Sequence, residues 1–273
     1  MSVRSELDRL SLNQMTIRQW NVREAIEGCA RAGLPALGLW REKVAEIGVT
    51  QSARLLRDAG LAVSSLCRGG WFPAASATER RARLEENFRA VEEAAELGAE
   101  VLVLVCGPAP DRDIAAGRLM VSEALEQLLP FAAQHQIKLG IEPLHPMFAA
   151  DRSVIVTLDE ARQLVRRFAS PYLGVVIDVY HVWWDPAVYE HIAAVRGSIF
   201  GFHVSDWLVP TPDMLNGRGL MGDGVIEIRR LRQAVDAASY QGPIEVEIFN
   251  EALWSLPGEE LLRQVCQHFI GYV

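Results

Sequence analysis

Short apolar runs alternate with amphipathic stretches along the whole chain. Each apolar run is rich in β-branched or aromatic residues and is bounded by polar or turn residues, which is the pattern of a buried strand. We expect eight strands, at Leu10–Met15, Ala36–Trp40, Leu61–Cys67, Val101–Cys106, Lys138–Glu142, Leu173–Asp178, Ile199–His203 and Ile244–Phe249.

Helix start and stop signals lie between these strands. Capping boxes are expected at Asn21/Glu24, Ser76/Glu79 and Thr157/Glu160, and left-handed C-caps at Gly33, Gly60 and Gly98. The unbroken alternation predicts an α/β fold, a single-domain (β/α)8 TIM barrel over residues 1–273. A doubly wound open sheet is the alternative, but residues 13–17 after the first strand lack its G-x-G-x-x-G motif.

Four of the predicted strands in the second half of the chain end in a metal-type ligand: Glu142, Asp178, His203 and Glu247. Parallel strands place their carboxyl ends on one face, where these side chains could converge on one cation. Three carboxylates and one imidazole suit Mn²⁺, Mg²⁺ or Co²⁺ better than a thiolate-type Zn²⁺ site. We therefore expect one divalent metal ion, with Zn²⁺ as a further option.

Strand periodicity extends this prediction to the layer below. If Glu247 points into the barrel, Glu245 does too, and a buried carboxylate is costly unless it is hydrogen-bonded. Gly140 and Gly201 precede two of the expected ligands by two positions and leave space in the interior. We expect Glu245 to occupy that space as a satisfied group that supports the site.

Several other polar residues are substrate or support candidates. His181 follows Asp178 at i+3, and we favour substrate contact over metal ligation or a structural role. Asp206 is expected to orient a ligand imidazole. Arg68 and Arg218 could each anchor a hydroxyl, carboxylate or phosphate, with an ordinary surface arginine as the alternative.

Aromatic residues and one long connection are expected around the same rim. All seven tryptophans fall at or shortly after predicted strand ends: Trp20, Trp40, Trp71, Trp183, Trp184, Trp207 and Trp254. Indole faces suit sugar C–H groups and exclude water, so Trp71 is a substrate-binding candidate, although some tryptophans could cap the barrel or form an oligomer interface. The Pro- and Gly-rich connection from Trp207 to Val225 is expected to be a lid. His145 is a rim candidate, whereas surface or packing roles are expected for His135, His191 and His268.

Composition narrows the functional class. The 273 residues suit one α/β barrel, and half of them are hydrophobic. A net charge of −8 argues against nucleic-acid and membrane-surface partners. Cys29, Cys67, Cys106 and Cys266 form no C-x-x-C pair, so we expect buried free thiols in the cytoplasm. The first residues lack the apolar region of a signal peptide, and no apolar run is long enough to span a membrane.

The motif set resembles the sugar phosphate isomerase/epimerase family of the xylose isomerase-like TIM barrel superfamily. The motifs are Glu142-Pro143, Asp178-x-x-His181, His203-Val204-Ser205-Asp206, Gly222-Asp223-Gly224 and residues 242–247, GPIEVE. The resemblance implies that Glu142, Asp178, His203 and Glu247 bind one divalent metal, that Glu142 and Glu247 are the acid–base pair, and that His181 contacts substrate. Arg218 matches the family's arginine only loosely, because its spacing is longer.

The superfamily also contains ketose 3-epimerases, inosose dehydratases and endonuclease IV. The extra histidines of endonuclease IV after strands two and three are replaced by Trp40-Arg41-Glu42 and Cys67-Arg68-Gly69. A DNA-repair role is therefore disfavoured.

The expected chemistry is proton transfer next to a carbonyl group. A divalent metal that chelates a carbonyl and its neighbouring hydroxyl stabilises an enediolate, while one of Glu142 and Glu247 removes a proton and the other returns it. We expect a metal-dependent isomerase or epimerase in carbohydrate metabolism, acting on a small sugar, keto-polyol or sugar acid. An inosose-dehydratase-type lyase and a non-catalytic sugar-binding protein are the alternatives. The expected partner is the carbohydrate substrate, and a homo-oligomer is left open.

Overall fold

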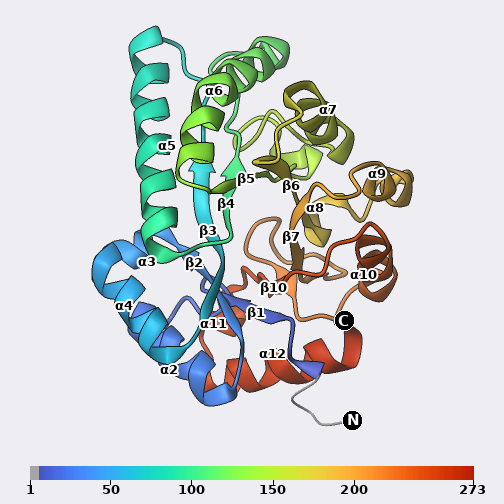
Figure 1. Cartoon of the computed structure of the whole chain (residues 1–273). Helices are drawn as coiled ribbons and strands as arrows, with labels where there is room; N and C mark the ends of the chain where they lie inside the picture. The colour runs from blue at the N-terminus through green and yellow to red at the C-terminus, as the bar shows by residue number, and fades with distance from the viewer. Residues whose placement is uncertain (1–5) are drawn as a thin grey trace.

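Parallel strands close on themselves to form the centre of the molecule (Figure 1). The computed structural model describes residues 6–273, so residues 1–5, where no signal peptide is expected, lie outside the described part. The ring order is β1-β10-β7-β6-β5-β4-β3-β2, which confirms the predicted (β/α)8 barrel. Its strands are β1 Leu10–Asn13, β2 Ala36–Trp40, β3 Ala62–Gly70, β4 Val101–Val105, β5 Lys138–Ile141, β6 Leu173–Asp178, β7 Ile199–Val204 and β10 Ile244–Val246.

Helices surround the barrel (Figure 1). They are α2 Val22–Ala32, α3 Arg41–Ala45, α4 Val49–Ala59, α5 Ala77–Leu97, α6 Ile114–Gln134, α7 Leu158–Phe168, α8 Val179–Val182, α9 Val188–Ala194, α10 Ile228–Ala237, α11 Glu251–Trp254 and α12 Gly258–Tyr272, with a 3₁₀ turn at Pro146–Phe148. The three predicted capping boxes start α2, α5 and α7, and the three predicted glycines end α2, α4 and α5 in left-handed conformation.

Strand β3 departs most from its predicted bounds, because it continues to Gly70. Its pairing with β4 shifts register between Cys67 and Gly69, which is a β-bulge. The Asn87 side chain on α5 then holds Gly70: the Gly70 N–H donates to Asn87 Oδ1 at 2.6 Å, and Asn87 Nδ2 donates to the Gly70 carbonyl at 2.8 Å. A helix side chain thus extends the strand, which local sequence pattern does not show.

The barrel interior is filled by side chains from facing strands. Cys67, Val101, Val103 and Val176 form a buried cluster there, separate from the larger core between strands and helices. The prediction that Glu245 occupies the space above the glycines of β5 and β7 is wrong, because Val176 fills that space. Glu245 instead packs against Gly38 of β2, where a Cβ atom would collide with its carboxylate.

A two-stranded antiparallel sheet anchors the long connection after β7. Strand β8 (Asp206–Trp207) pairs with β9 (Arg218–Gly219), and Gly217 bridges to Asn250 beyond β10. The connection is therefore tied to the barrel at both of its ends.

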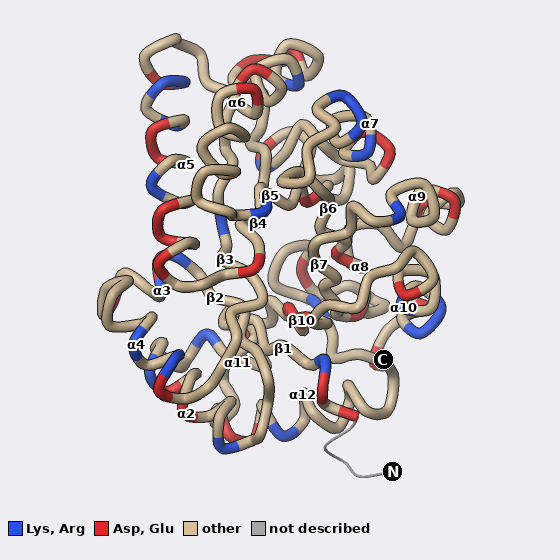
Figure 2. The backbone as a smooth tube through the Cα atoms, viewed as in Figure 1, with Lys and Arg blue, Asp and Glu red and all other residues tan. Residues whose placement is uncertain are grey.

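The helices carry charges of both signs, and the cysteines, all within residues 6–273, form no disulfide. Lys and Arg alternate with Asp and Glu along helices such as α5 (Figure 2). All four cysteines are free, three of them buried and Cys266 half-buried. None of the helices within residues 6–273 has the length and apolar character needed to cross a membrane.

Candidate metal centre

Three of the four predicted ligands converge. One ligand atom from each of Glu142, His203 and Glu247 lies within 4.8 Å of the others. His203 Nδ1 is 3.4 Å from Glu142 Oε1 and 3.7 Å from Glu247 Oε2. All three side chains are buried. Whether they bind a metal stays a prediction, but their arrangement is that of a small cation site.

Barrel hydrogen bonds place these side chains. The Glu142 N–H donates to the Leu104 carbonyl of β4 at 3.1 Å, and the Glu247 N–H donates to the Val204 carbonyl of β7 at 3.1 Å. In the ring, β5 and β10 are separated by β6 and β7. Glu142 and Glu247 therefore reach the same point from different sides of the barrel.

Asp178 lies beside this group but outside it. Its Oδ2 accepts from Arg218 Nη1 at 2.8 Å, and its Oδ1 accepts from the Tyr180 N–H at 2.9 Å. Arg218 Nη1 also lies 3.2 Å from Glu247 Oε2. The guanidinium thus joins Asp178 to the convergent cluster and compensates part of its negative charge.

Burial and mutual charge set the protonation of the cluster. Burial raises the pKa of Glu142 to about 7, and it also raises the pKa of Asp178. Burial alone would raise the pKa of Glu247, but His203 and Arg218 outweigh it and lower this pKa. Burial alone would lower the pKa of His203, but the surrounding carboxylates, Glu245 first, raise it well above its usual range. These pKa shifts arise because several ionisable groups are buried close together.

The donor atoms fit a divalent cation. Among the described residues, both ring nitrogens of His203 and Oε1 of Glu142 are buried without a hydrogen-bond partner. Buried polar atoms without partners are rare in proteins and call for an explanation such as an ion. Two carboxylates and one imidazole are suitable ligands for Mn²⁺, Zn²⁺ or a similar ion.

Glu245 lies beneath the cluster, with Oε2 3.8 Å from His203 Nε2, and its carboxylate is fully hydrogen-bonded. Its Oε1 accepts from Asn13 Nδ2 at 2.6 Å and from the Ser65 hydroxyl at 3.0 Å, and its Oε2 accepts from the Ser64 hydroxyl at 2.8 Å. The Asn13 amide also donates to Glu247 Oε1 at 3.1 Å. Asn13 therefore links the two layers, a role that the sequence interpretation missed.

A cavity of about 260 Å³ opens above the cluster. Glu142, Glu247, His181 and Arg218 line its polar side, and Trp40, Trp71 and Phe249 are among its aromatic walls. This volume is at the small end of the range for ligand pockets. The cavity suits a small polar molecule beside the three convergent side chains.

Two predicted substrate contacts, His181 and Arg218, line this cavity together. Arg218 Nη2 lies 3.3 Å from His181 Nε2. Burial, followed by the charge of Arg218, holds the pKa of His181 well below its usual range, so the imidazole is neutral near pH 7. Arg218 itself lies between the rings of Tyr180 and Phe249, at 4.5 and 5.0 Å from their centroids.

Asp206 has a different role from the predicted one. Its Oδ1 accepts from the backbone N–H groups of Trp207 and Ile226 at 2.9 and 3.0 Å, and its Oδ2 accepts from the Gly222 N–H at 2.8 Å. The carboxylate therefore holds the long connection in place and does not orient the His203 ring. Arg218 and Leu215 of that connection reach the cavity, while its mobility as a lid stays a prediction.

The tryptophans divide between several places. Trp40 and Trp71 line the cavity, and Trp40 Nε1 donates to Asn13 Oδ1 at 3.0 Å. Trp207 stacks on Tyr180 with ring centroids 4.7 Å apart, and Trp183 packs against Trp207. Trp20 packs against glycines of α2 and α12, away from the cavity. The rim prediction therefore describes only part of the set.

The remaining histidines lie outside the convergent cluster. His145 packs against Trp184 and Trp207 at the rim. His135 packs on Phe131, and the ring of His191 hydrogen-bonds to Asp185.

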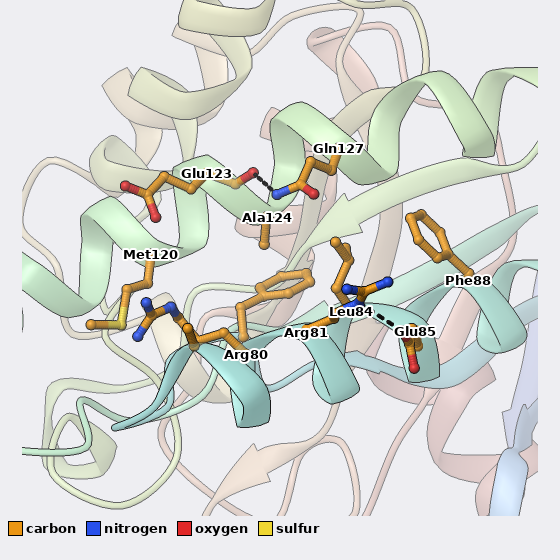
Figure 3. Close-up of a pocket in the computed structure, with 11 residues that line it drawn as sticks. Arg80, Arg81, Leu84, Glu85, Phe88, Met120, Glu123, Ala124 and Gln127 are labelled. Atoms are coloured by element: carbon orange, nitrogen blue, oxygen red, sulfur yellow. Dashed lines mark hydrogen bonds and ion pairs between the residues drawn. The ribbon is translucent and has the colours of Figure 1, made fainter.

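A larger hollow lies between α5 and α6 (Figure 3). Its volume is about 480 Å³, and its walls carry Arg81, Glu85, Glu123 and Gln127. Arg81 bonds to Glu85, and the Gln127 amide donates to the backbone carbonyl of Glu123 (Figure 3). This hollow lacks the convergent, unpartnered ligands that mark the barrel site.

The fold and the cluster together identify the family. Residues 26–271 match the family described as xylose isomerase-like TIM barrel, and the chain belongs to it. The 3-dehydroshikimate dehydratase of Pseudomonas aeruginosa is 30% identical to this chain over 190 residues, which is 65% of this chain. The match spans only 28% of the length of that relative.

Solved structures extend the likeness to the whole barrel. Protein SMc04130 from Sinorhizobium meliloti 1021 is 44% identical, with a TM-score of 0.95 over 96% of this chain and 98% of that one. The IolI protein with a bound zinc atom has a TM-score of 0.85 at 17% identity, over 96% and 97% of the two chains. The 3-keto-D-glucoside 4-epimerase of E. coli has a TM-score of 0.77 at 19% identity, over 96% and 98%. The last two share the fold alone.

Proposed function

We propose that this chain is a divalent-metal-dependent isomerase or epimerase of a small sugar, keto-polyol or sugar acid. The observation that carries the proposal is the convergence of Glu142, His203 and Glu247, two of which, Glu142 and Glu247, line a small cavity. Epimerases such as the 3-keto-D-glucoside enzyme share this fold, which supports the reaction class.

The proposed metal ligands are Glu142, His203 and Glu247, with Asp178 beside them as the fourth. The zinc atom bound by the IolI protein supports a metal site in this fold. A divalent ion supplies positive charge that stabilises negative charge on substrate oxygens and makes a neighbouring C–H bond more acidic.

The proton steps belong to the two glutamates. Glu142 follows β5 and Glu247 follows β10, and β6 and β7 lie between these two strands in the ring. The two carboxylates therefore reach a substrate from different directions. One carboxylate removes the proton next to the carbonyl group, and the other returns a proton to the new position or face. His181, neutral at pH 7, hydrogen-bonds a substrate hydroxyl, and the walls of Trp40, Trp71 and Phe249 keep water away.

A lyase of the dehydratase type is the second candidate, and one specific observation favours it. The curated relatives from Pseudomonas aeruginosa and Pseudomonas putida are 3-dehydroshikimate dehydratases. A dehydratase uses the same first proton abstraction and then expels a β-hydroxyl group. Product mass separates the two reactions, because only the lyase product has lost water.

The experiment is a substrate panel in D₂O with the full chain loaded with Mn²⁺. Keto-sugars, keto-polyols and sugar acids are incubated with the protein and followed by NMR and mass spectrometry. Deuterium on the carbon next to the carbonyl, with no loss of water, supports an isomerase or epimerase. Loss of water supports the lyase. A metal-loaded protein that neither exchanges protons nor converts any member of the panel would overturn both.

The place of action is also proposed. Four free cysteines support a reducing compartment, and we infer the cytoplasm. Small-molecule substrates are the proposed partners, and no macromolecular partner is needed for the chemistry.

A further inference from the structure

Two arginine side chains in the cavity wall have no protein acceptor. Arg68 and Arg152 line the same cavity as Glu142 and Glu247. Within residues 6–273, neither guanidinium hydrogen-bonds or ion-pairs with another protein group, and Nε of Arg152 is buried without a partner. A guanidinium has five N–H donors, and buried donors without acceptors are costly. Both side chains are half-buried, so their N–H groups remain able to donate to an acceptor that enters the cavity.

Both guanidinium groups lie over aromatic rings. Arg68 lies over the Trp71 ring at 4.3 Å from the centroid, and Arg152 lies over the Phe148 ring at 5.6 Å. Such cation–π contacts fix the plane of a guanidinium and leave the N–H groups on its edge free. The two side chains are thus positioned without their hydrogen-bonding capacity being used.

Arg68 lies at the register shift in β3. The register of β3 against β4 shifts between Cys67 and Gly69, on either side of Arg68. The paired hydrogen bonds between Gly70 and Asn87 hold the strand directly after the bulge. Bulges commonly redirect a side chain next to a binding site. Arg68 therefore lines the cavity from a paired strand rather than from a flexible surface tail.

The charges around the pair favour an anion. Burial is the largest cause that lowers the pKa of Arg68; Glu42 opposes the shift, whereas Arg152 and Arg41 add to it. Glu42 is exposed and forms no ion pair with Arg68 among the described residues. Arg68 and Arg152 are like charges that line one cavity, and an oxyanion between them reduces their repulsion.

Arg218 shows the contrast with a guanidinium that is already used. Its Nη1 donates to Asp178 Oδ2 at 2.8 Å and to Glu247 Oε2 and the Glu247 carbonyl, each at 3.2 Å. It therefore acts as an internal countercharge of the cluster. Nε of Arg218 is also buried without a partner, but its Nη1 is committed to the cluster, whereas no nitrogen of Arg68 or Arg152 is hydrogen-bonded within residues 6–273.

We infer that Arg68 and Arg152 form an anion-binding pair, and that the substrate carries a carboxylate or phosphate group. This inference deepens the proposed function and rests on it for the assignment of the cavity as the substrate site. The cavity of about 260 Å³ limits the substrate to a small, monosaccharide-sized anion.

Three six-carbon probes with the same backbone test the inference: D-gluconate, D-glucitol 6-phosphate and neutral D-glucitol. Their affinities are measured by calorimetry with the full chain, metal-free and saturated with Mn²⁺. We expect one or both anions to bind roughly tenfold or more tightly than glucitol, because charge-assisted hydrogen bonds to guanidinium are among the strong ones. Preference for gluconate identifies a carboxylate, and preference for the phosphate ester identifies a phosphate.

Variants of Arg68 and Arg152 test whether these two residues cause the preference for anions. Arg68→Gln and Arg152→Gln should each weaken anion binding by roughly tenfold and leave glucitol binding unchanged, since each removes one cation. Arg68→Lys should retain part of the preference because it keeps the charge. Arg166→Gln is the matched control, because Arg166 is exposed on α7, away from the cavity. Unfolding curves confirm that all variants are folded.

Two results would overturn the inference: equal affinity for all three probes, or an unchanged anion preference in the Arg68→Gln/Arg152→Gln double variant. The outcome is independent of the D₂O experiment. An anion preference without proton exchange would support the arginine pair and reject the proposed reaction. Proton exchange on neutral sugars alone would support the reaction and reject the arginine pair.

Discussion

Glu245 and Glu247 lie two positions apart at the end of the same barrel strand, and both are buried, yet their surroundings differ. Three neutral donors, from Asn13, Ser64 and Ser65, satisfy the carboxylate of Glu245. Glu247 shares one oxygen with Asn13 and faces the cation Arg218 and the His203 ring with the other. The lower carboxylate is enclosed by fixed hydrogen bonds, and the upper one belongs to a charged cluster.

The difference shows how to separate structural from functional buried carboxylates. Groups that only support a fold tend to be fully hydrogen-bonded, because an unmet buried polar atom costs free energy. The upper layer retains unpartnered atoms on Glu142 and His203 within the described chain. These unpartnered atoms are available to coordinate a ligand such as a metal ion. The following changes test this contrast.

The largest effect is expected on turnover. Glu142→Gln and Glu247→Gln keep side-chain volume and one oxygen but remove the base, so turnover of the substrate found by the panel should fall by about 10²–10⁴. The free energy of unfolding should change little. Glu92→Gln, at an exposed position of α5, is the control. Wild-type deuterium exchange in both variants would show that the proton moves through another group.

The next largest effect is expected on metal affinity, which should depend on the upper layer and not on the lower one. We expect one divalent ion per chain, and His203→Ala should weaken its binding by about 100-fold or more, because it removes one of few ligands. Asp178→Asn should also weaken it, and Ser64→Ala beneath Glu245 should leave it nearly unchanged. Metal analysis after dialysis measures occupancy. Full occupancy in both His203→Ala and Asp178→Asn would reject the assignment.

The free energy of unfolding should depend more on Glu245 in the lower layer than on Glu247 in the upper layer. Glu245→Leu removes the acceptor of the Ser65 hydroxyl and one of the partners of Asn13 and of Ser64, so the free energy of unfolding should fall by about 3 kcal/mol or more. Glu247→Gln should cost much less, since it keeps one oxygen acceptor and Arg218 keeps its hydrogen bond to Asp178. Urea unfolding of the metal-free proteins gives both values. Equal losses would mean that the two layers do not differ as described.

The smallest effect is expected in the long connection from Trp207 to Val225. Hydrogen exchange there should slow when a substrate analogue binds, because Leu215 and Arg218 line the cavity. Asp206→Asn should speed exchange roughly tenfold by weakening the bonds to the backbone N–H groups of Gly222 and Ile226. Exchange that is the same with and without saturating ligand would contradict a lid.

Local sequence patterns were enough to predict the barrel and the convergence of Glu142, His203 and Glu247 at one end of it. Apolar runs of strand length, capping boxes and terminal glycines are local signals, and they identified every barrel strand with small errors at the ends. The alternation of side chains along a strand also predicted that Glu245 and Glu247 face the same interior. These inferences succeed because they depend on periods of a few residues.

The tertiary structure alone decided how these residues are paired. Asn13 is 232 residues away in sequence from Glu245, and Ser64 is 181 residues away, so no local pattern announces their hydrogen bonds. Barrel closure brings β1 and β3 to Glu245, and Arg68, at the register shift in β3, lines the cavity that Arg152 enters from another loop. Which carboxylate is satisfied and which cation is left free depends on distances set by register and closure, and these exist only once the chain is folded.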